Sequence, residues 1–102
     1  MKVIYISGPY RGDGTPDQIF ENIMRARAAA KKVWQDGNAA ICPHMNTAFM
    51  DGAADDSVWL KGDMAILCRC DEMYVLPGWE DSAGTKQEIV TASCLKLPIT
   101  YL

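Results

Sequence analysis

The hydrophobic positions of this chain form two patterns, namely short apolar runs and one long helical stripe. Mainly apolar runs occur at residues 2–6, 39–42, 73–76 and 96–102. Short apolar runs without regular alternation are typical of parallel strands that are covered on both faces. Proline follows the second and third runs directly and prevents either strand from continuing. Four strands are therefore predicted.

The longest helix is predicted between the first two strands. It spans residues 15–35, with Thr15 as its N-cap and Pro16 at its first position, and Gly37 ends it. Its apolar residues recur at spacings of four and three, which is the pattern of a helix with one buried face. This stripe consists of Ile19, Ile23, Ala26, Ala30 and Val33. The basic residues off the stripe, which are expected to form a solvated face, are Arg25, Arg27, Lys31 and Lys32.

Two shorter helices are predicted in the second half of the chain. The first spans residues 57–69, with Ser57 as its N-cap. The second begins after an N-cap at Asp81 or Ser82 and ends with the apolar segment 89–95. The buried face of the first of these helices is expected to consist of Leu60, Met64 and Leu67.

Strands and helices thus alternate along the chain, which predicts an α/β fold. Right-handed crossovers place such strands in one parallel sheet with helices on both faces. The expected architecture is a three-layer, flavodoxin-like (Rossmann-like) sandwich of four to five strands in the order 2-1-3-4. A chain of 102 residues has the size of a single domain, so one domain over residues 1–102 is predicted.

Ligands of open parallel sheets bind beyond the carboxyl ends of the strands, where the strand order reverses. The loop after the first strand carries Gly8, Arg11 and Gly12 there. An arginine suits bidentate contacts with phosphate or carboxylate, and a solvated loop arginine is the alternative. The loop after the third strand brings Ser82 and Gly84 to a helix N-terminus, where free N–H groups attract anions.

Two acids and a histidine are further candidates for chemistry. Glu88 has small neighbours at helical spacing, which leave a gap over its carboxylate, and an exposed first-turn acid is the alternative. Asp63 has mainly apolar neighbours, and a carboxylate there needs a salt bridge or a task. His44 follows a strand and could contact a ligand, although it could also be a packed or capping residue. The loop that it begins, residues 44–56, is long for a compact domain, so it is expected to be functional or mobile.

Composition narrows the class of ligand. The chain has a formal net charge of −3, which argues against non-specific binding to DNA, RNA or anionic membranes. No apolar run approaches the ~20 residues of a membrane span, and no signal-peptide pattern begins the sequence. A cytoplasmic protein that binds a small phosphorylated ligand is therefore expected.

The four cysteines are predicted to be reduced, buried and structural, because they form no CxxC pair and lie mostly in or beside apolar runs. They are Cys42, Cys68, Cys70 and Cys94. A zinc site made by three of them, Cys42, Cys68 and Cys70, together with His44 is the alternative. No metal or organic cofactor is predicted.

Segments along nearly the whole chain resemble the nucleoside 2-deoxyribosyltransferase superfamily. The likeness is greatest to short phage and bacterial members that are catalogued as a domain of unknown function. It rests on two motifs that together are fairly specific, Tyr-x-x-Gly-x-x-Arg-Gly at residues 5–12 and Gly-Trp-x-x-Ser-x-Gly-x-x-x-Glu at residues 78–88. Pro43-His44, Asp63 and Cys70-Asp71 extend it.

The resemblance implies a role for each matching residue. Glu88 matches the nucleophile that attacks C1′ of a 2′-deoxyribonucleoside or its 5′-monophosphate. Asp63 matches the acid near the leaving base, and Tyr5 matches the tyrosine that positions the nucleophile. The residues that match 5′-phosphate contacts in the similar deoxynucleoside 5′-monophosphate N-glycosidases are Gly8, Arg11, Ser82 and Gly84.

Ser82 favours a nucleotide over a nucleoside, because transferases of unphosphorylated nucleosides have an acid at this position and an acid repels phosphate. Pro9 departs from the pattern, since the N-glycosidase branch has a phosphate-contacting serine there. The resemblance also implies a homo-oligomer. Larger members complete a neighbouring subunit's site through a segment downstream of the position of Leu102.

Three hypotheses for function follow. The first is an enzyme that cleaves or transfers the N-glycosidic bond of a 2′-deoxyribonucleotide, with hydrolysis and transfer both left open. The second is a non-catalytic nucleotide-binding or sensing module on the same fold. The third is a structural or interaction protein whose pocket is vestigial.

Overall fold

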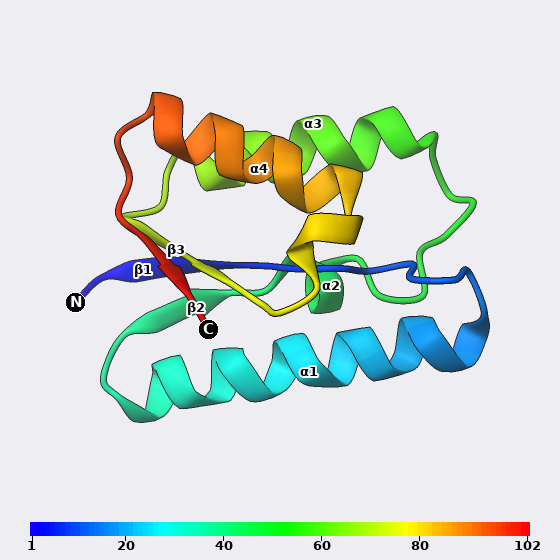
Figure 1. Cartoon of the computed structure of the whole chain (residues 1–102), viewed down its shortest axis with the longest axis horizontal. Helices are drawn as coiled ribbons and strands as arrows, with labels where there is room; N and C mark the ends of the chain where they lie inside the picture. Colours follow the sequence, from blue (N-terminus) through cyan, green and yellow to red (C-terminus); the bar gives the residue numbers. More distant parts are fainter.

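The predicted strands form one parallel sheet in the order β2-β1-β3-β4 (Figure 1). The computed structural model describes all 102 residues. The strands are β1 (Val3–Ser7), β2 (Ala39–Ile41), β3 (Glu72–Val75) and β4 (Ile99–Tyr101). In the central pair, Tyr5 lies beside Met73 and Ser7 beside Val75. The sheet therefore has four strands and the strand order that the sequence predicts.

Helices cover both faces of this sheet, as predicted, with α1 on one side and α3 and α4 on the other (Figure 1). The long helices are α1 (Pro16–Gln35), α3 (Asp56–Leu67) and α4 (Ala83–Cys94). Two short helices, α2 (Pro43–Asn46) and the single 3-10 turn η1 (Trp79–Asp81), lie in the loops that follow β2 and β3. None of the helices is both long and apolar enough to cross a membrane.

Alternate residues of β1 face the two helical layers. Ile4 and Ile6 are buried in a cluster with the stripe of α1. Tyr5 points to the opposite face and is buried with residues of β3, α3 and α4. Because side chains alternate along a strand, Ser7 shares the face of Tyr5. Both sides of β1 therefore contribute to the core, and the side of Tyr5 and Ser7 also presents two hydroxyl groups toward α4.

The predictions for α1 are confirmed except at its polar face. Thr15 is the N-cap, and its hydroxyl oxygen accepts a hydrogen bond of 3.2 Å from the Gln18 amide. Four residues of the predicted stripe are buried and Ile19 is half-buried. Asn22 is also buried, and its amide donates to the Tyr10 carbonyl oxygen at 3.0 Å. This hydrogen bond ties α1 to the loop after β1.

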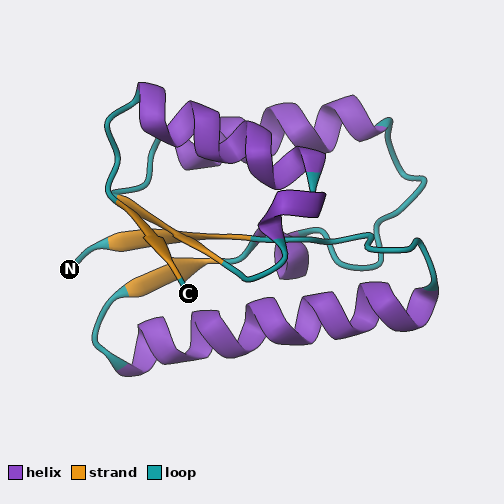
Figure 2. Ribbon diagram, in the orientation of Figure 1, coloured by secondary structure: helices purple, strands orange, loops and turns teal.

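The start of α3 and its buried face differ from the prediction. The helix begins at Asp56 with Asp55 at the N-cap, not with Ser57. Leu67 is buried, but Leu60 is 50% exposed. Figure 2 shows the reason, since the first half of α3 lies over loops and only its second half over strands. Leu60 therefore has no sheet to pack against.

The prediction that residues 44–56 form a loop is wrong at the start of that segment. The four-residue helix α2 occupies that position. Pro43 at its first position favours the turn, but four residues are too few for a hydrophobic period to reveal it. At the other end of the chain, Ser82 is confirmed as the N-cap of α4, whereas Asp81 belongs to η1.

The cysteine prediction is only partly correct. All four thiols are free. Cys70, which follows α3, is buried and Cys42 is half-buried, but Cys68 and Cys94 are exposed. The last two stand at the carboxyl ends of α3 and α4, where neighbouring apolar residues in the sequence do not share the buried face of the helix.

Candidate active site

Glu88 is held against the sheet by two hydroxyl groups from one face of β1. Tyr5 donates a hydrogen bond from its phenolic oxygen to Oε2 of Glu88. Ser7 donates from Oγ to Oε1 at 2.8 Å. Each carboxylate oxygen therefore has its own donor, and the carboxyl group is fixed in orientation. This contact contradicts the alternative that Glu88 is an exposed acid at a helix start.

The surroundings of Glu88 shift its titration toward neutrality. Burial raises the pKa of Glu88 to about 7, and the nearby Asp63 carboxylate raises it too, while the hydrogen bonds from Tyr5 and Ser7 oppose the shift. Burial, with the Glu88 charge beside it, raises the pKa of Tyr5 above its ordinary value. The tyrosine hydroxyl therefore keeps its proton and remains a donor at physiological pH.

Asp63, on α3, lines the same cleft as Glu88 and lies near enough to influence its charge. Burial raises its pKa, and its charge in turn raises the pKa of both Glu88 and Tyr5. The alternative of a structural salt bridge fails, because the two ion pairs of the molecule are Lys2–Glu72 and Arg11–Asp56. Asp63 is thus a half-buried acid without a cationic partner, and such a group is suited to carrying a proton.

These acids lie at a cleft of about 770 Å³ beyond the carboxyl ends of the strands. Ligand pockets are typically of this size. The structure brings the candidate residues together around the cleft, with Tyr5 buried beneath Glu88. Those that line it are Gly8, Arg11, Gly12, His44, Asp63, Ser82, Gly84 and Glu88.

The N-terminus of α4 forms one wall of the cleft. The Ser82 hydroxyl oxygen accepts hydrogen bonds from the Thr85 amide at 3.2 Å and the Thr85 hydroxyl at 2.9 Å. The Ser82 hydroxyl can still donate its own proton, and the first N–H groups of a helix have no hydrogen-bond partner within the helix. A Cβ atom added at Gly84 would meet no atom within 4 Å. This helix end is therefore open to an anion.

The two glycines of the first loop have structural reasons to be glycine. A Cβ atom at Gly8 would lie 2.6 Å from the Leu76 side chain. Gly12 has a φ of +55°, and a Cβ atom there would lie 2.2 Å from the Gln18 side chain. Both residues line the cleft, but the packing of the loop already explains their identity.

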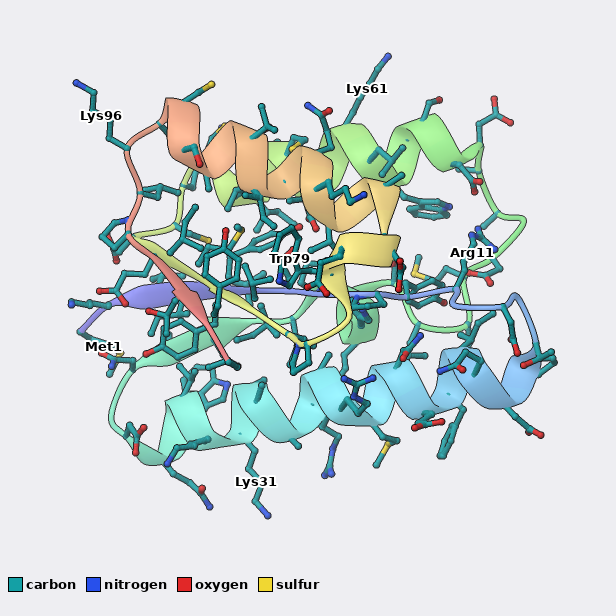
Figure 3. All side chains as sticks on the ribbon, viewed as in Figure 1. Met1, Arg11, Lys31, Lys61, Trp79 and Lys96 are labelled. Carbon is teal, nitrogen blue, oxygen red and sulfur yellow. The ribbon has the colours of Figure 1, made fainter.

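Arginines lie at the cleft in two places, of which the sequence predicts one. Arg11 pairs with Asp56 at 3.2 Å and lies at the loop end of the molecule (Figure 3). Arg25 also lines the cleft and donates to the Pro77 carbonyl oxygen at 3.2 Å. Arg25 is exposed, which confirms the predicted solvated face, but the sequence does not predict its position at the cleft. In contrast, Lys31 on the same helix points away into solvent (Figure 3).

His44 fits the packed alternative better than a free ligand contact. It is buried, and its Nε2 lies 2.7 Å from the Pro9 carbonyl oxygen. A carbonyl only accepts, so Nε2 carries the proton. Burial lowers the pKa of His44, which keeps the ring neutral at pH 7. The ring also meets Tyr10 edge-on, with 5.4 Å between centroids, and so fixes the loop after β1.

Several residues of the site escaped prediction. Ser7 had a signal, because it stands two residues after Tyr5 in a strand and must share its face. Arg25 and Tyr10 had none, since a helix surface and a loop carry no period that points to a cleft. No group of three or more His, Cys, Asp or Glu side chains is arranged to hold a metal ion, which contradicts the zinc alternative for the cysteines.

A comparison with models of known protein families shows the family to which this chain belongs. A family model described as "Domain of unknown function (DUF7768)" matches residues 2–102. The chain belongs to this family. A search of curated proteins found no match for this DUF7768 domain.

Two solved structures with the same fold are 2-deoxyribosyltransferases. One, from the psychrotolerant bacterium Bacillus psychrosaccharolyticus, has a TM-score of 0.68 and 16% identity, with 97% of this chain and 70% of that chain covered. That protein is described as a biocatalyst for the synthesis of nucleosides. Another, from Leishmania mexicana, has a TM-score of 0.69 and 19% identity, with 100% of this chain and 64% of that chain covered. The DUF7768 domain thus has the fold of these enzymes and spans under two thirds of the second one.

Proposed function

We propose that this chain cleaves or transfers the N-glycosidic bond of a 2′-deoxyribonucleoside 5′-monophosphate, with Glu88 as the nucleophile. The observation that carries the proposal is the Glu88 carboxyl group, fixed by Tyr5 and Ser7 beside an unpaired acid at the cleft. The fold shared with two 2-deoxyribosyltransferases supports the same class of reaction. The motifs that resemble that superfamily fall on these residues.

In the first step, an oxygen of ionised Glu88 attacks C1′ of the sugar. The C1′–N bond breaks through an oxocarbenium-like transition state, and its electron pair stays on the base nitrogen. Asp63, in its protonated form, gives its proton to the departing base. The products of this step are the free base, the Asp63 carboxylate and a deoxyribosyl ester on Glu88.

In the second step, water or the N–H of a second base attacks C1′ of the ester. The bond between C1′ and the Glu88 oxygen breaks, and the carboxylate is regenerated. Asp63 accepts the proton that the attacking group loses, which restores the starting state. Hydrolysis and transfer therefore use the same residues and differ only in the attacking group.

The 5′-phosphate is proposed to bind at the N-terminus of α4. The Ser82 hydroxyl and the N–H groups of Ala83 and Gly84 are donors there, and the helix dipole adds attraction for an anion. Arg11 supplies positive charge if the phosphate replaces Asp56 as its partner. A serine at this helix start, where an acid would repel phosphate, favours the nucleotide as substrate.

Release of free base from deoxynucleoside monophosphates tests this proposal. We expect the wild-type protein to release base and Glu88→Gln to lose at least about a hundredfold in rate, because an amide is not a nucleophile. The matched control is Glu80→Gln, an exposed residue outside the cleft. Nucleotide-dependent thermal stabilisation without any release of base would instead identify a binding module.

A further inference from the structure

The three tryptophans of the chain occupy different environments. Trp79 packs against the core beneath α4, with its ring centroid 5.4 Å from that of Tyr101 (Figure 3). Trp34 is 57% exposed on α1 and does not line the cleft. Trp59 is half-buried in the cleft wall and belongs to neither core cluster. Packing of the core therefore does not account for the third indole.

Trp59 stands one helical turn before Asp63 on α3. Residues four apart in a helix share a face, and both side chains line the cleft. The proposed reaction needs Asp63 within reach of a nitrogen of the leaving base. The base must then lie along this face of α3, beside the indole.

We propose that Trp59 is the surface on which the base of the substrate stacks. This inference rests on the proposed function. It places the base of the substrate beside Trp59 and the phosphate at the N-terminus of α4. Every nucleobase has a π-face, so a stacking platform accepts all four bases. Stacking grows with ring area, so purine nucleotides are bound more tightly than pyrimidine nucleotides. Such a contact adds nothing to the binding of a sugar phosphate that lacks a base.

The test compares dAMP with 2-deoxyribose 5-phosphate, by calorimetric titration in a Glu88→Gln background that does not consume the nucleotide. Trp59→Ala is expected to weaken dAMP binding by about 5- to 150-fold, the range of one base–aromatic stack. Binding of 2-deoxyribose 5-phosphate should not change. Trp59→Phe should keep most of the dAMP affinity, and Trp34→Ala, the matched control, should alter neither ligand.

Tryptophan fluorescence supplies a second measurement, in case Trp59→Ala folds poorly. We expect dAMP to quench the emission of the protein that contains Trp59, and to quench it no longer in Trp59→Phe, while calorimetry shows that this variant still binds. Quenching that persists in Trp59→Phe would overturn the inference.

The remaining outcomes separate the inference from the proposed function. Unchanged dAMP affinity in Trp59→Ala, or an equal loss for both ligands, would overturn the stacking role and leave the proposed function standing. Binding of neither ligand by the parent protein would overturn both.

Discussion

At the scale of the residue, the site depends on one carboxyl group whose two oxygens are bound by different hydroxyls. The chain keeps Glu88 in a place that raises its pKa to about 7, well above the ordinary value of 4.5. A raised pKa means that folding favours the protonated form. The ionised form of Glu88 therefore lowers the free energy of unfolding, which is common for catalytic acids and nucleophiles.

That cost predicts a dependence of stability on pH. The contribution of Glu88 to stability is fully present below about pH 4.5 and is lost as the pH rises through about 7. Glu88→Gln removes the titration and still accepts a hydrogen bond from Tyr5 or Ser7. We expect it to raise the free energy of unfolding at pH 8 by up to about 3 kcal/mol relative to the wild type.

Urea unfolding of both proteins at pH 4.5 and pH 8 measures this effect. Near pH 4.5 the advantage of Glu88→Gln should largely disappear, and Glu80→Gln should show no such pattern. An advantage of equal size at both pH values would contradict the assigned pKa shift.

The two hydroxyl donors give a second prediction at this scale. Both hydrogen bonds lower the pKa of Glu88, so Ser7→Ala should raise it further. A hydrogen bond to a charged group contributes about 1.5–3 kcal/mol, which corresponds to one or two pKa units. The acid limb of the rate of base release should then shift to higher pH by about one unit. The exposed Ser93→Ala serves as the control, and an unshifted limb in Ser7→Ala would show that this bond does not tune Glu88.

At the scale of the element, the N-terminus of α4 combines a cap with a proposed phosphate site. Ser82 accepts two hydrogen bonds from Thr85, and so it stabilises the helix that carries Glu88. Both serine and aspartate are good N-caps, but only aspartate adds negative charge. A pair of substitutions can therefore separate the two roles.

Ser82→Asp is expected to keep the stability of the protein and to weaken binding of deoxynucleoside monophosphates at least about tenfold, by repulsion of the phosphate. Ser82→Ala should instead lose about 1 kcal/mol of stability with the cap. Thermal unfolding and calorimetric titration with dAMP and deoxyadenosine measure both effects. Equal binding of the nucleotide by Ser82→Asp and the wild type would place the phosphate elsewhere.

The elements that the sequence predicts are those with a long or continuous pattern. The stripe from Ile19 to Val33 and the run before Ser7 each require one structure, because only one face or one conformation buries them. The sequence does not predict helix α2, because a single helical turn is too short to show a hydrophobic period. It does not predict the exposure of Leu60 either, because the residues of α3 do not indicate how far the sheet beneath the helix extends. The sequence indicates Asp63 as a candidate because its helical neighbours are mainly apolar, and Glu88 because its neighbours are small and it follows a loop where open sheets bind ligands. Arg25 has no local signal.

At the scale of the whole molecule, the two faces of β1 differ in their relation to the site, because only one of them carries groups that contact Glu88. Ile4 and Ile6 face α1, and Tyr5 and Ser7 face α4 and the site. The layer of α1 and the layer of α3 and α4 pack on opposite faces of this sheet, and α1 reaches the cleft only near its polar residues such as Asn22 and Arg25. A change at a residue of the α1 cluster that does not line the cleft, such as Ile4, should therefore alter the stability of the fold without altering the chemistry of the cleft.

Ile4→Val tests this separation. The loss of one buried methylene should cost about 0.5–1.5 kcal/mol of stability. The rate of base release at 25 °C should stay within about twofold of the wild type, because the free energy of unfolding of a domain, about 5–15 kcal/mol, is larger than this loss. Urea unfolding and a turnover assay measure the two quantities. A large fall in turnover with the fold intact would show that the α1 layer is coupled to the site.

The central claim is that the Glu88 carboxylate becomes covalently attached to the sugar. Rapid acid quenching of the protein during turnover of a deoxynucleoside monophosphate, followed by peptide mass spectrometry, tests it most directly. The account predicts a deoxyribose 5-phosphate adduct on the peptide that contains Glu88, absent from Glu88→Gln. Release of base by the wild type with an adduct on another residue, or undiminished release by Glu88→Gln, would contradict it.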